Sequence, residues 1–310
     1  MSIADPPSDF QPARHRLPQP LRAMLWYVLA LSLWGMSAGL VRYAALEVPA
    51  IELGFLRAFY GMVLVIPWLL YYRVSPVPRR HVGIYVLRGV CEVGGIATWF
   101  IALSLMQAAD VVALGFTMPF FASILAAIFL GERLRLRRGL AILIGLIGAV
   151  IVIRPGQSDI GSAALIPLLG AIVVAVSRLS SRVLAARGEP MIQLVASLGF
   201  ITAPILAIPA AFVWVWPSPA MMLLAFTVSV ISLTGHVCMV RALRLGEASV
   251  LATYEFTQLL ATVAIAAAVL GEWPDRWTWI GSAIILAAGL YIARREAALA
   301  RKEASEKAGQ

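Results

Sequence analysis

Long apolar runs alternate with short polar connections along almost the whole of this 310-residue chain. About 20 mostly apolar residues are enough for a helix to cross the hydrocarbon core of a bilayer. A helix also satisfies its own backbone hydrogen bonds there. The pattern therefore predicts ten transmembrane helices, over residues 23–43, 50–72, 82–105, 109–130, 138–154, 163–183, 191–213, 218–241, 248–270 and 277–294.

The connections are only a few residues long and hold turn-forming residues, as in "RVSPVPRR", "RPGQSDIG" and "GEWPDR". No soluble domain fits within them. The runs also lack the alternation in ten-residue segments that is typical of a transmembrane barrel of strands. The fold class that follows is an all-α integral membrane protein with two polar tails. We expect residues 1–22 to form a disordered cytoplasmic tail and residues 295–310 a second cytoplasmic tail.

Composition supports lipid as the main solvent of the chain. It is 61% hydrophobic and 13% charged, whereas soluble domains are about half apolar and a quarter charged. Both cysteines, Cys91 and Cys238, lie inside apolar runs with no metal-ligand spacing, which is typical of cysteines that pack as small apolar residues. We expect no metal and no cofactor.

The net charge of +9 is distributed unevenly across the predicted membrane. If both termini lie on one side, only Arg154 and Arg276 fall in connections on the other side, while Arg42, Arg57 and Arg88 lie within or at the end of spans. Every other Lys and Arg lies on the side of the termini. Because cytoplasmic loops carry the excess of basic residues, we expect both termini to be cytoplasmic, and the charge does not indicate nucleic acid as a partner.

A short motif occurs twice, as "LGERLRLRR" at residues 130–138 and "LGEWPDRWT" at residues 270–278. Its glutamates, Glu132 and Glu272, are 140 residues apart. Five spans separate the copies, and an odd number of spans places them on opposite sides of the membrane. This explains why only the first copy is rich in arginine.

The same offset relates further arginines, namely Arg42 with Arg182 and Arg154 with Arg294. The halves 23–154 and 163–294 are therefore predicted to form a 5+5 inverted repeat. This organisation is common in secondary transporters, whose substrate site lies near the midplane between the repeats.

Each half ends in a similar way, with "FTMPFFASILAAIFLGERLRLRRGLAILIGLIGAVIVIRP" in the first and "FTQLLATVAIAAAVLGEWPDRWTWIGSAIILAAGLYIARR" in the second. These segments resemble the EamA-type domain of the drug/metabolite transporter superfamily. The stretches "YVLRGVCEVGGIATWFIALSLMQAADVVALGFTMPFF" and "LGEWPD" are most similar to the group that includes S-adenosylmethionine uptake carriers. The resemblance implies a multi-pass protein of the bacterial inner membrane that moves a small organic solute.

The resemblance also draws attention to Pro119 in the fourth span, which removes one backbone hydrogen bond and is expected to kink a gating helix. The second half has Leu259 at the corresponding place. Whether the ninth span bends like the fourth is therefore open. In the fifth and tenth spans, Gly145 and Gly148, with Gly281 and Gly289, are small residues that allow helices to approach closely.

Charged residues inside spans are the main candidates for function, because each costs about 2.5–3.5 kcal/mol to insert at the bilayer centre. Arg57 lies in the second span, and Arg88 and Glu92 lie four residues apart on one face of the third. Two interpretations of Arg88 and Glu92 remain: mutual neutralisation, or a charged lining in which Arg57 or Arg88 meets a substrate carboxylate and Glu92 meets a cationic group or a proton.

The second half offers a corresponding polar set. Glu255 lies in the ninth span beside Tyr254 and close to Gln258, and it has no partner in its own span, so it is a coupling candidate together with Glu92. His236 either titrates near neutral pH or packs through a hydrogen bond. Trp99 either stacks on a planar substrate or belongs to the core. Other arginines, namely Arg42, Arg178 and Arg182, are expected to snorkel toward the interface.

Enzyme motifs of the phosphate-loop, H-E-x-x-H and G-x-S-x-G types do not occur. The sequence therefore predicts a secondary carrier of a small polar organic metabolite, such as an amino acid or a compound like S-adenosylmethionine, that works by alternating access. Protons or a counter-substrate would supply the energy, and the protein would be a monomer or homodimer in the bilayer. An exporter of amino acids or drugs is the nearer alternative, and an intramembrane lipid-modifying enzyme is the more distant one.

Overall fold

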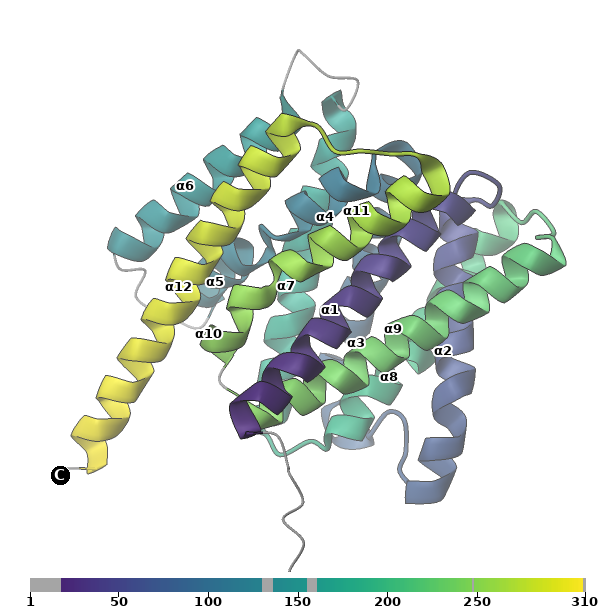
Figure 1. Ribbon diagram of the computed structural model, residues 1–310. Helices are drawn as coiled ribbons and strands as arrows, with labels where there is room; N and C mark the ends of the chain where they lie inside the picture. Colours follow the sequence, from purple (N-terminus) through teal and green to yellow (C-terminus); the bar gives the residue numbers. More distant parts are fainter. Residues whose placement is uncertain (1–17, 130–135, 155–160, 247, 309–310) are drawn as a thin grey trace, which may run out of the picture.

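The computed structural model describes residues 18–129, 136–154, 161–246 and 248–308, and this part of the chain is helical without a strand (Figure 1). It contains ten helices that are long and apolar enough to cross a membrane. The predicted all-α fold is confirmed. The elements are α1 Gln19–Ala44, α2 Ala50–Tyr72, η1 Arg79–His81, α3 Val82–Leu105, α4 Ala108–Gly115, α5 Met118–Phe129, α6 Leu136–Ile153, η2 Gly161–Ala164, α7 Leu165–Ala186, α8 Met191–Phe212, α9 Pro219–Leu245, α10 Ala248–Leu251, η3 Ala252–Tyr254, α11 Phe256–Leu270 and α12 Arg276–Ala308.

The two ends of the bundle are distinguished by the chain termini. At the termini end, α1 begins and α12 ends (Figure 1). At the far end, α1, α3 and α6 end and α12 begins. Arg154, directly after α6, forms an ion pair with Asp275, directly before α12, which joins two connections at the far end. Most of the predicted N-terminal tail, residues 1–17, lies outside the described residues.

This ion pair bears on the inverted repeat. The 18 residues of α6 span about 27 Å, so Leu136, which follows the first "LGE", lies at the opposite end from Asp275, which follows the second. Glu132 itself lies outside the described residues. The residues that follow the two copies of the motif are therefore at opposite ends of the bundle, as an inverted 5+5 arrangement requires.

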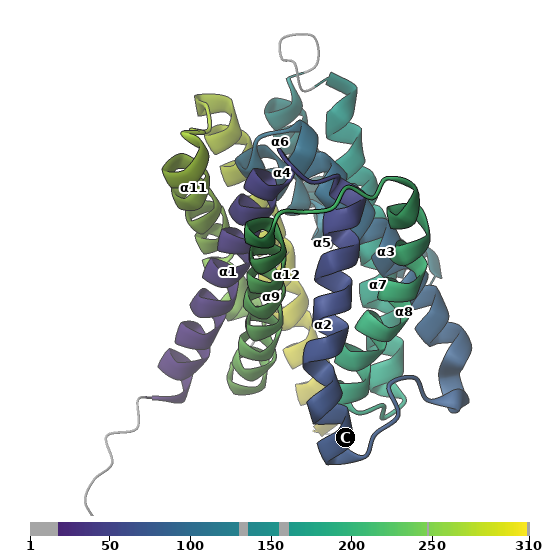
Figure 2. The ribbon, with the colours of Figure 1, turned by 90° about the vertical axis from the view of Figure 1, so that its right-hand side faces the viewer.

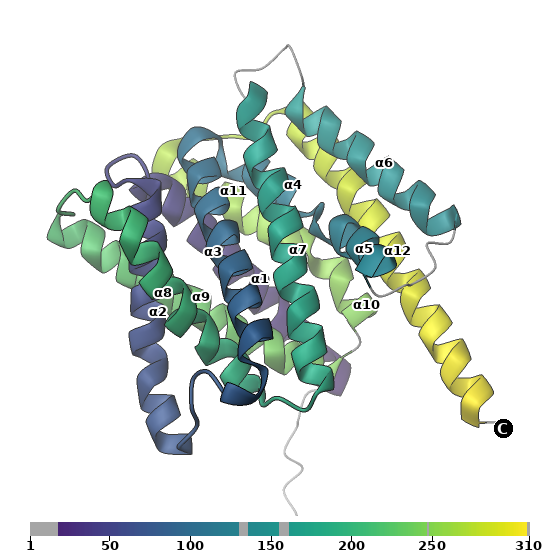
Figure 3. The same cartoon turned by 180° about the vertical axis from the view of Figure 1, so that it is seen from behind.

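Six spans form two groups of three packed helices. Helices α1, α9 and α11 make up the first group, and α3, α5 and α7 the second (Figures 1 and 3). The remaining spans pack as the pairs α2 with α8 and α6 with α12, and Figure 2 shows α2 between the two groups. Each group takes helices from both halves of the sequence, so the two repeats are interleaved.

Both the fourth and the ninth spans are interrupted. The fourth breaks at Phe116 and Thr117, between α4 and α5, where the ring of Pro119 disfavours a helical conformation in the turn before it. The ninth passes from α10 through η3 and becomes regular only at Phe256, 140 residues after Phe116. The ninth span therefore has the same interruption although Leu259 stands where the proline would be.

Glycines allow close backbone approach at two of these helix contacts. A Cβ on Gly35 of α1 would lie 2.4 Å from the carbonyl oxygen of Gln258 in α11. A Cβ on Gly281 of α12 would lie 2.6 Å from the carbonyl oxygen of Gly148 in α6, and one on Gly148 would lie 2.9 Å from that of Gly281. The predicted close packing is thus confirmed for Gly148 and Gly281. It is wrong for Gly289, where a Cβ would meet only Cε1 of Phe120 at 3.8 Å.

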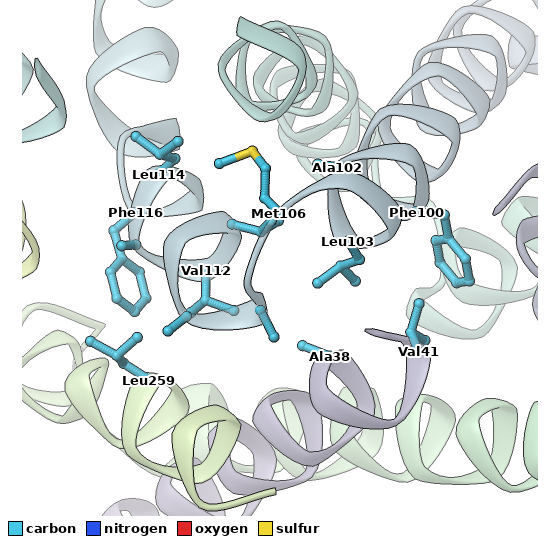
Figure 4. Packing of buried hydrophobic residues seen from close by; sticks show 14 of the residues in the cluster. Ala38, Val41, Phe100, Ala102, Leu103, Met106, Val112, Leu114, Phe116 and Leu259 are labelled. Atoms are coloured by element: carbon cyan, nitrogen blue, oxygen red, sulfur yellow. The ribbon is translucent and has the colours of Figure 1, made fainter. Parts of the chain in front are cut away.

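The hydrophobic core differs between the two ends. Toward the far end one continuous cluster joins the two groups, with Val41 from α1, Leu103 from α3, Val112 from α4 and Leu259 from α11 (Figure 4). Outside the two groups it also extends along α6 and α12 toward the termini end, to Ala141 and Ile292. Toward the termini end the buried residues of the two groups fall into separate clusters. One contains Ala23, Tyr27, Leu31, Ala242 and Leu251, and the other contains Tyr85, Leu184 and Leu194.

Candidate functional site

Titratable side chains of α2, α3 and α9 lie within electrostatic range of one another in the interior of the bundle. Arg57 lies within electrostatic range of Glu92 and of His236. Its backbone carbonyl accepts a hydrogen bond of 3.2 Å from the Ser229 hydroxyl, which fixes α2 against α9. Within the described part of the chain, no ion pair joins the Arg57 guanidinium to a carboxylate. Its charge therefore remains available to an anionic ligand.

Glu92 is held from the neighbouring helix. Its Oε2 accepts a hydrogen bond of 2.8 Å from the hydroxyl of Ser177 on α7, and the residue is half-buried. A single neutral donor orients the carboxylate, and no ion pair joins it to an arginine among the described residues.

Arg88 is engaged by protein groups. It is only 7% exposed. Its Nε donates to the Ser181 hydroxyl at 2.6 Å, and its Nη1 donates to the Leu194 carbonyl at 2.6 Å and to the Ser197 hydroxyl at 3.2 Å. No ion pair joins it to Glu92 among the described residues. Arg88 thus links α3 to α7 and α8, and these bonds occupy donors that a substrate would need.

Glu255 lies at the junction of η3 and α11, where the ninth span is interrupted. The hydroxyl of Tyr27 approaches its Oε1 at 3.5 Å, which is a long and therefore weak contact. Its neighbour Tyr254 packs against the termini-end cluster of α1, α9 and α10. The side chain of Gln258 is half-buried one turn further on, while its backbone carbonyl faces Gly35.

His236 packs through a hydrogen bond, which is one of the two roles that the sequence left open. Its Nδ1 lies 2.8 Å from the Ser232 carbonyl, and because a carbonyl only accepts, Nδ1 carries the hydrogen. Nε2 of the neutral ring is then an acceptor. The ring also packs edge-on to Trp34 at 5.0 Å between centroids. Trp99 instead packs over Gly115 at the edge of the far-end cluster, where a Cβ would lie 2.9 Å from its Cζ3.

Sequence reasoning misses the role of Arg178. Its charge lies within electrostatic range of Tyr27, His236 and Glu255, which all belong to the opposite helix group. The side chain of Arg178 is exposed, whereas Tyr27 is buried and His236 and Glu255 are half-buried. A signal is present in the serines around it, since Ser177 and its neighbours give α7 a polar face.

Arg42 does not snorkel as predicted, because it forms an ion pair of 2.9 Å with Glu272 and binds two carbonyls of α3. The side chain of its repeat counterpart, Arg182, lies outside the described residues. Two buried carboxylates are not evident as such from the sequence. Glu52 accepts the Val215 N–H at 3.0 Å, and Asp110 accepts the Thr278 hydroxyl at 2.5 Å.

Comparison with known proteins identifies the fold and the function class. The model of the EamA-like transporter family matches residues 21–154 and 161–294. The S-adenosylmethionine uptake transporter of Rickettsia bellii is 26% identical over 270 residues, which are 86% of this chain and 91% of the relative. The riboflavin transporter of Rhizobium johnstonii is 27% identical over 92% of this chain and 96% of its own.

An exporter and a crystal structure are also similar. The pseudopaline exporter of Pseudomonas aeruginosa is 27% identical over 87% of this chain and 95% of its own. The crystal structure superposes with a TM-score of 0.61 at 21% identity, covering 88% of this chain and 98% of the other. The latter supports the fold alone.

Proposed function

Because the chain belongs to the EamA-like transporter family, and is thus a multi-pass membrane transporter and not an enzyme, we propose that its substrate is a zwitterionic organic metabolite. This compound would carry a planar ring, as S-adenosylmethionine and the aromatic amino acids do. It would bind at mid-depth between the two helix groups, with protons or a counter-substrate driving transport.

The observation that carries this proposal is the set of charges of both signs in the bundle interior. Arg57 and Arg178 offer positive charge, while Glu92 and Glu255 offer negative charge, and among the described residues none of them is neutralised by an ion pair. Unpaired charges at membrane depth are costly, so their retention favours a role in binding or coupling. A zwitterion complements both signs at once.

The names of the relatives support a substrate that contains a planar ring. S-adenosylmethionine and riboflavin each contain a planar nitrogen heterocycle. In this chain, the Trp34 and His236 rings lie beside the charged set. We infer that they flank the ring of the substrate, and that Arg88 and Trp99 shape the site from behind.

Two carboxylates are assigned to coupling. Glu92 and Glu255 come from opposite helix groups, and each has only one hydroxyl neighbour among the hydrogen bonds of the described residues. A proton on either group would change the net charge of the site, so loading and release of a charged substrate would be linked to protonation. His236 is the third candidate, through its Nε2 acceptor.

The proposal is tested with purified protein, first by thermal stabilisation. A ligand that binds the native state raises the unfolding temperature, so S-adenosylmethionine, aromatic amino acids and polyamines are screened in detergent. A compound that stabilises the protein is then followed into proteoliposomes. No stabilisation by the zwitterions, with stabilisation by polyamines instead, would overturn the assigned substrate class.

The site is tested in the same vesicles with Glu92→Gln and Glu255→Gln, each of which removes one negative charge. We expect uptake to fall at least about ten-fold, the effect of losing about 1.4 kcal/mol of interaction, while the unfolding temperature changes little. Glu47→Gln is the matched control, since Glu47 is exposed in the connection after α1. Unchanged uptake in both site variants would show that these carboxylates do not couple transport.

Export is the second candidate direction, because one relative is named as an exporter. Counterflow in vesicles of known orientation distinguishes import from export. Uptake that requires an outward-directed gradient of protons or of a counter-substrate would favour export of the same class of compound.

A further inference from the structure

We propose that Arg42 is the latch that closes the far end of the bundle, and that the structure is the state closed at the far end and parted at the termini end. The inference concerns the conformational cycle of the transporter. It holds whatever substrate the proposed site binds, so it can fail or succeed separately from the proposed function.

The first observation is the position of Arg42. It lies in the last turn of α1, in the first helix group. Its Nε donates to Glu272 Oε1 at 2.9 Å, and its Nη1 donates to the carbonyls of Leu103 at 3.1 Å and Ser104 at 3.0 Å, both at the end of α3 in the second group. One guanidinium therefore ties the two groups together.

The ends of α3 and α11 are built to receive this guanidinium. The last carbonyls of a helix have no intrahelical partner and carry partial negative charge, so a cation there is favourable. Gly271 ends α11 with a φ of 68°, a conformation that favours glycine. The chain reverses there, and the next residue, Glu272, reaches back to α1. This accounts for the Gly-Glu dipeptide of the second motif.

The latch is also shielded from water. The side chains of Arg42 and Glu272 are only 16% and 17% exposed, so water and salt screen their attraction less than they screen an ion pair at the surface. Charge-assisted bonds to two carbonyls add geometric specificity. In the part of the chain that the structure describes, all hydrogen bonds between the two groups come from Arg42.

The second observation is that packing between the groups differs from one end to the other. At the far end, α4 packs against α1 and α11 on one side and against α3 and α7 on the other. The far-end cluster is continuous across both groups (Figure 4). At the termini end, α5 packs on α7 and α10 packs near α9 and α12, and each group has a buried cluster of its own.

The third observation is the exposure of Arg178. It lies toward the termini end of α7 and is exposed, although its charge acts on groups of the opposite bundle. An opening between the groups at this end accounts for its exposure. The three observations agree on a state in which the interior site faces the termini end, and Arg42 must release α3 before the far end can open.

The test measures accessibility of a far-end thiol and does not use transport. In a background with Cys91→Ala and Cys238→Ala, Val41→Cys places a thiol in the far-end cluster, where Val41 is 3% exposed. The detergent-solubilised protein is treated with a polar maleimide. We expect slow labelling, and about ten-fold faster labelling when Arg42→Ala is added, since about 1.4 kcal/mol shifts a two-state equilibrium ten-fold.

Two further variants guard against simple misfolding. Arg42→Lys keeps the charge but cannot reach three acceptors, so labelling should rise less than with Arg42→Ala. Arg154→Gln removes another far-end ion pair, one that joins the α6 and α12 ends outside the two groups, and should leave labelling unchanged.

The outcomes separate the two proposals. If the thiol introduced by Val41→Cys stays as protected with Arg42→Ala as without it, at the same unfolding temperature, the latch is overturned even if Glu92→Gln still abolishes uptake. Faster labelling with Arg42→Ala but without any ligand-induced stabilisation would support the latch and contradict the assigned substrate. Equal acceleration by Arg154→Gln would also overturn the latch, because it would indicate general loosening of the far end.

Discussion

At the scale of single residues, the contribution of the Asp275 carboxylate to stability can be measured as a function of pH. Asp275 precedes α12, and its Oδ1 accepts the N–H groups of Trp277 at 3.0 Å and Thr278 at 2.9 Å, which caps the helix. Burial alone would raise the pKa of Asp275, but the Thr278 hydrogen bonds and the charge of Arg154 outweigh it and hold the pKa below its usual range.

A group whose pKa is lowered by folding stabilises the native state above its ordinary pKa of about 3.9 and loses that contribution as pH falls through the lowered value. We therefore expect Asp275→Ala to lower stability by about 1 kcal/mol at pH 7, as loss of a helix cap does. The difference from the parent should shrink below about pH 4. Thermal unfolding in detergent from pH 7 to pH 3 measures this, and a constant difference would refute the role of the ionised form.

Residue pairs also show where sequence reasoning ends. Charge within an apolar run identifies Glu92 and Glu255 as candidate residues. The partners of charged residues cannot be predicted in this way, because the Arg42–Glu272 pair joins residues 230 positions apart and the Glu92–Ser177 bond joins residues 85 apart. Hydropathy along a chain carries no information on which helices become neighbours, so it wrongly predicts that Arg42 snorkels to the interface.

At the scale of elements, the contact of α6 with α12 depends on two glycines. A side chain at position 281 would meet the Gly148 carbonyl oxygen at 2.6 Å and Cγ2 of Val152 at 2.5 Å, so the helices would have to separate. Overpacking of this kind costs about 1–3 kcal/mol. We expect Gly281→Leu to lower the unfolding temperature clearly.

Gly289→Ala on the same helix is the control, because its Cβ would meet only Cε1 of Phe120 at 3.8 Å, an ordinary contact distance. It should be neutral or slightly stabilising, since alanine is the better helix former. If the two substitutions behave alike, the contact between α6 and α12 is not close enough to need glycine.

The sequence predicts the transmembrane spans well, because hydropathy defines them. It predicts helix breaks and helix ends poorly, because these depend on backbone geometry. All ten predicted spans are present, with ends that differ by a few residues, but α12 continues as a helix to Ala308 where the sequence predicts a tail after residue 294. The break in the fourth span could be expected from Pro119. The break in the ninth span before Phe256 could not be expected, because Leu259 is a good helix former and the local sequence does not predict a break.

At the scale of the whole molecule, the distribution of arginine predicts the orientation. Trp273 lies at the far end with 71% of its surface exposed, and Arg137 is exposed at the start of α6, at the opposite end. In intact cells, we expect an impermeant thiol reagent to label Trp273→Cys from outside and Arg137→Cys only after permeabilisation. Labelling of both from outside would contradict the inverted topology, and the reverse pattern would invert the orientation.

The interleaving of the two repeats has a consequence for how the protein is made. Helix α1 finds its principal neighbours late in the chain, as the 198 positions between Trp34 and Ser232 illustrate. The ribosome must deliver most of the polypeptide before the first inserted segment meets its final neighbours. Until then its small-residue surface stays in lipid, where a premature partner could capture it. A chain that ends after the first repeat therefore lacks the helices against which α1 packs, and cannot form half of the bundle. Quality control during biogenesis also has a long interval in which to act.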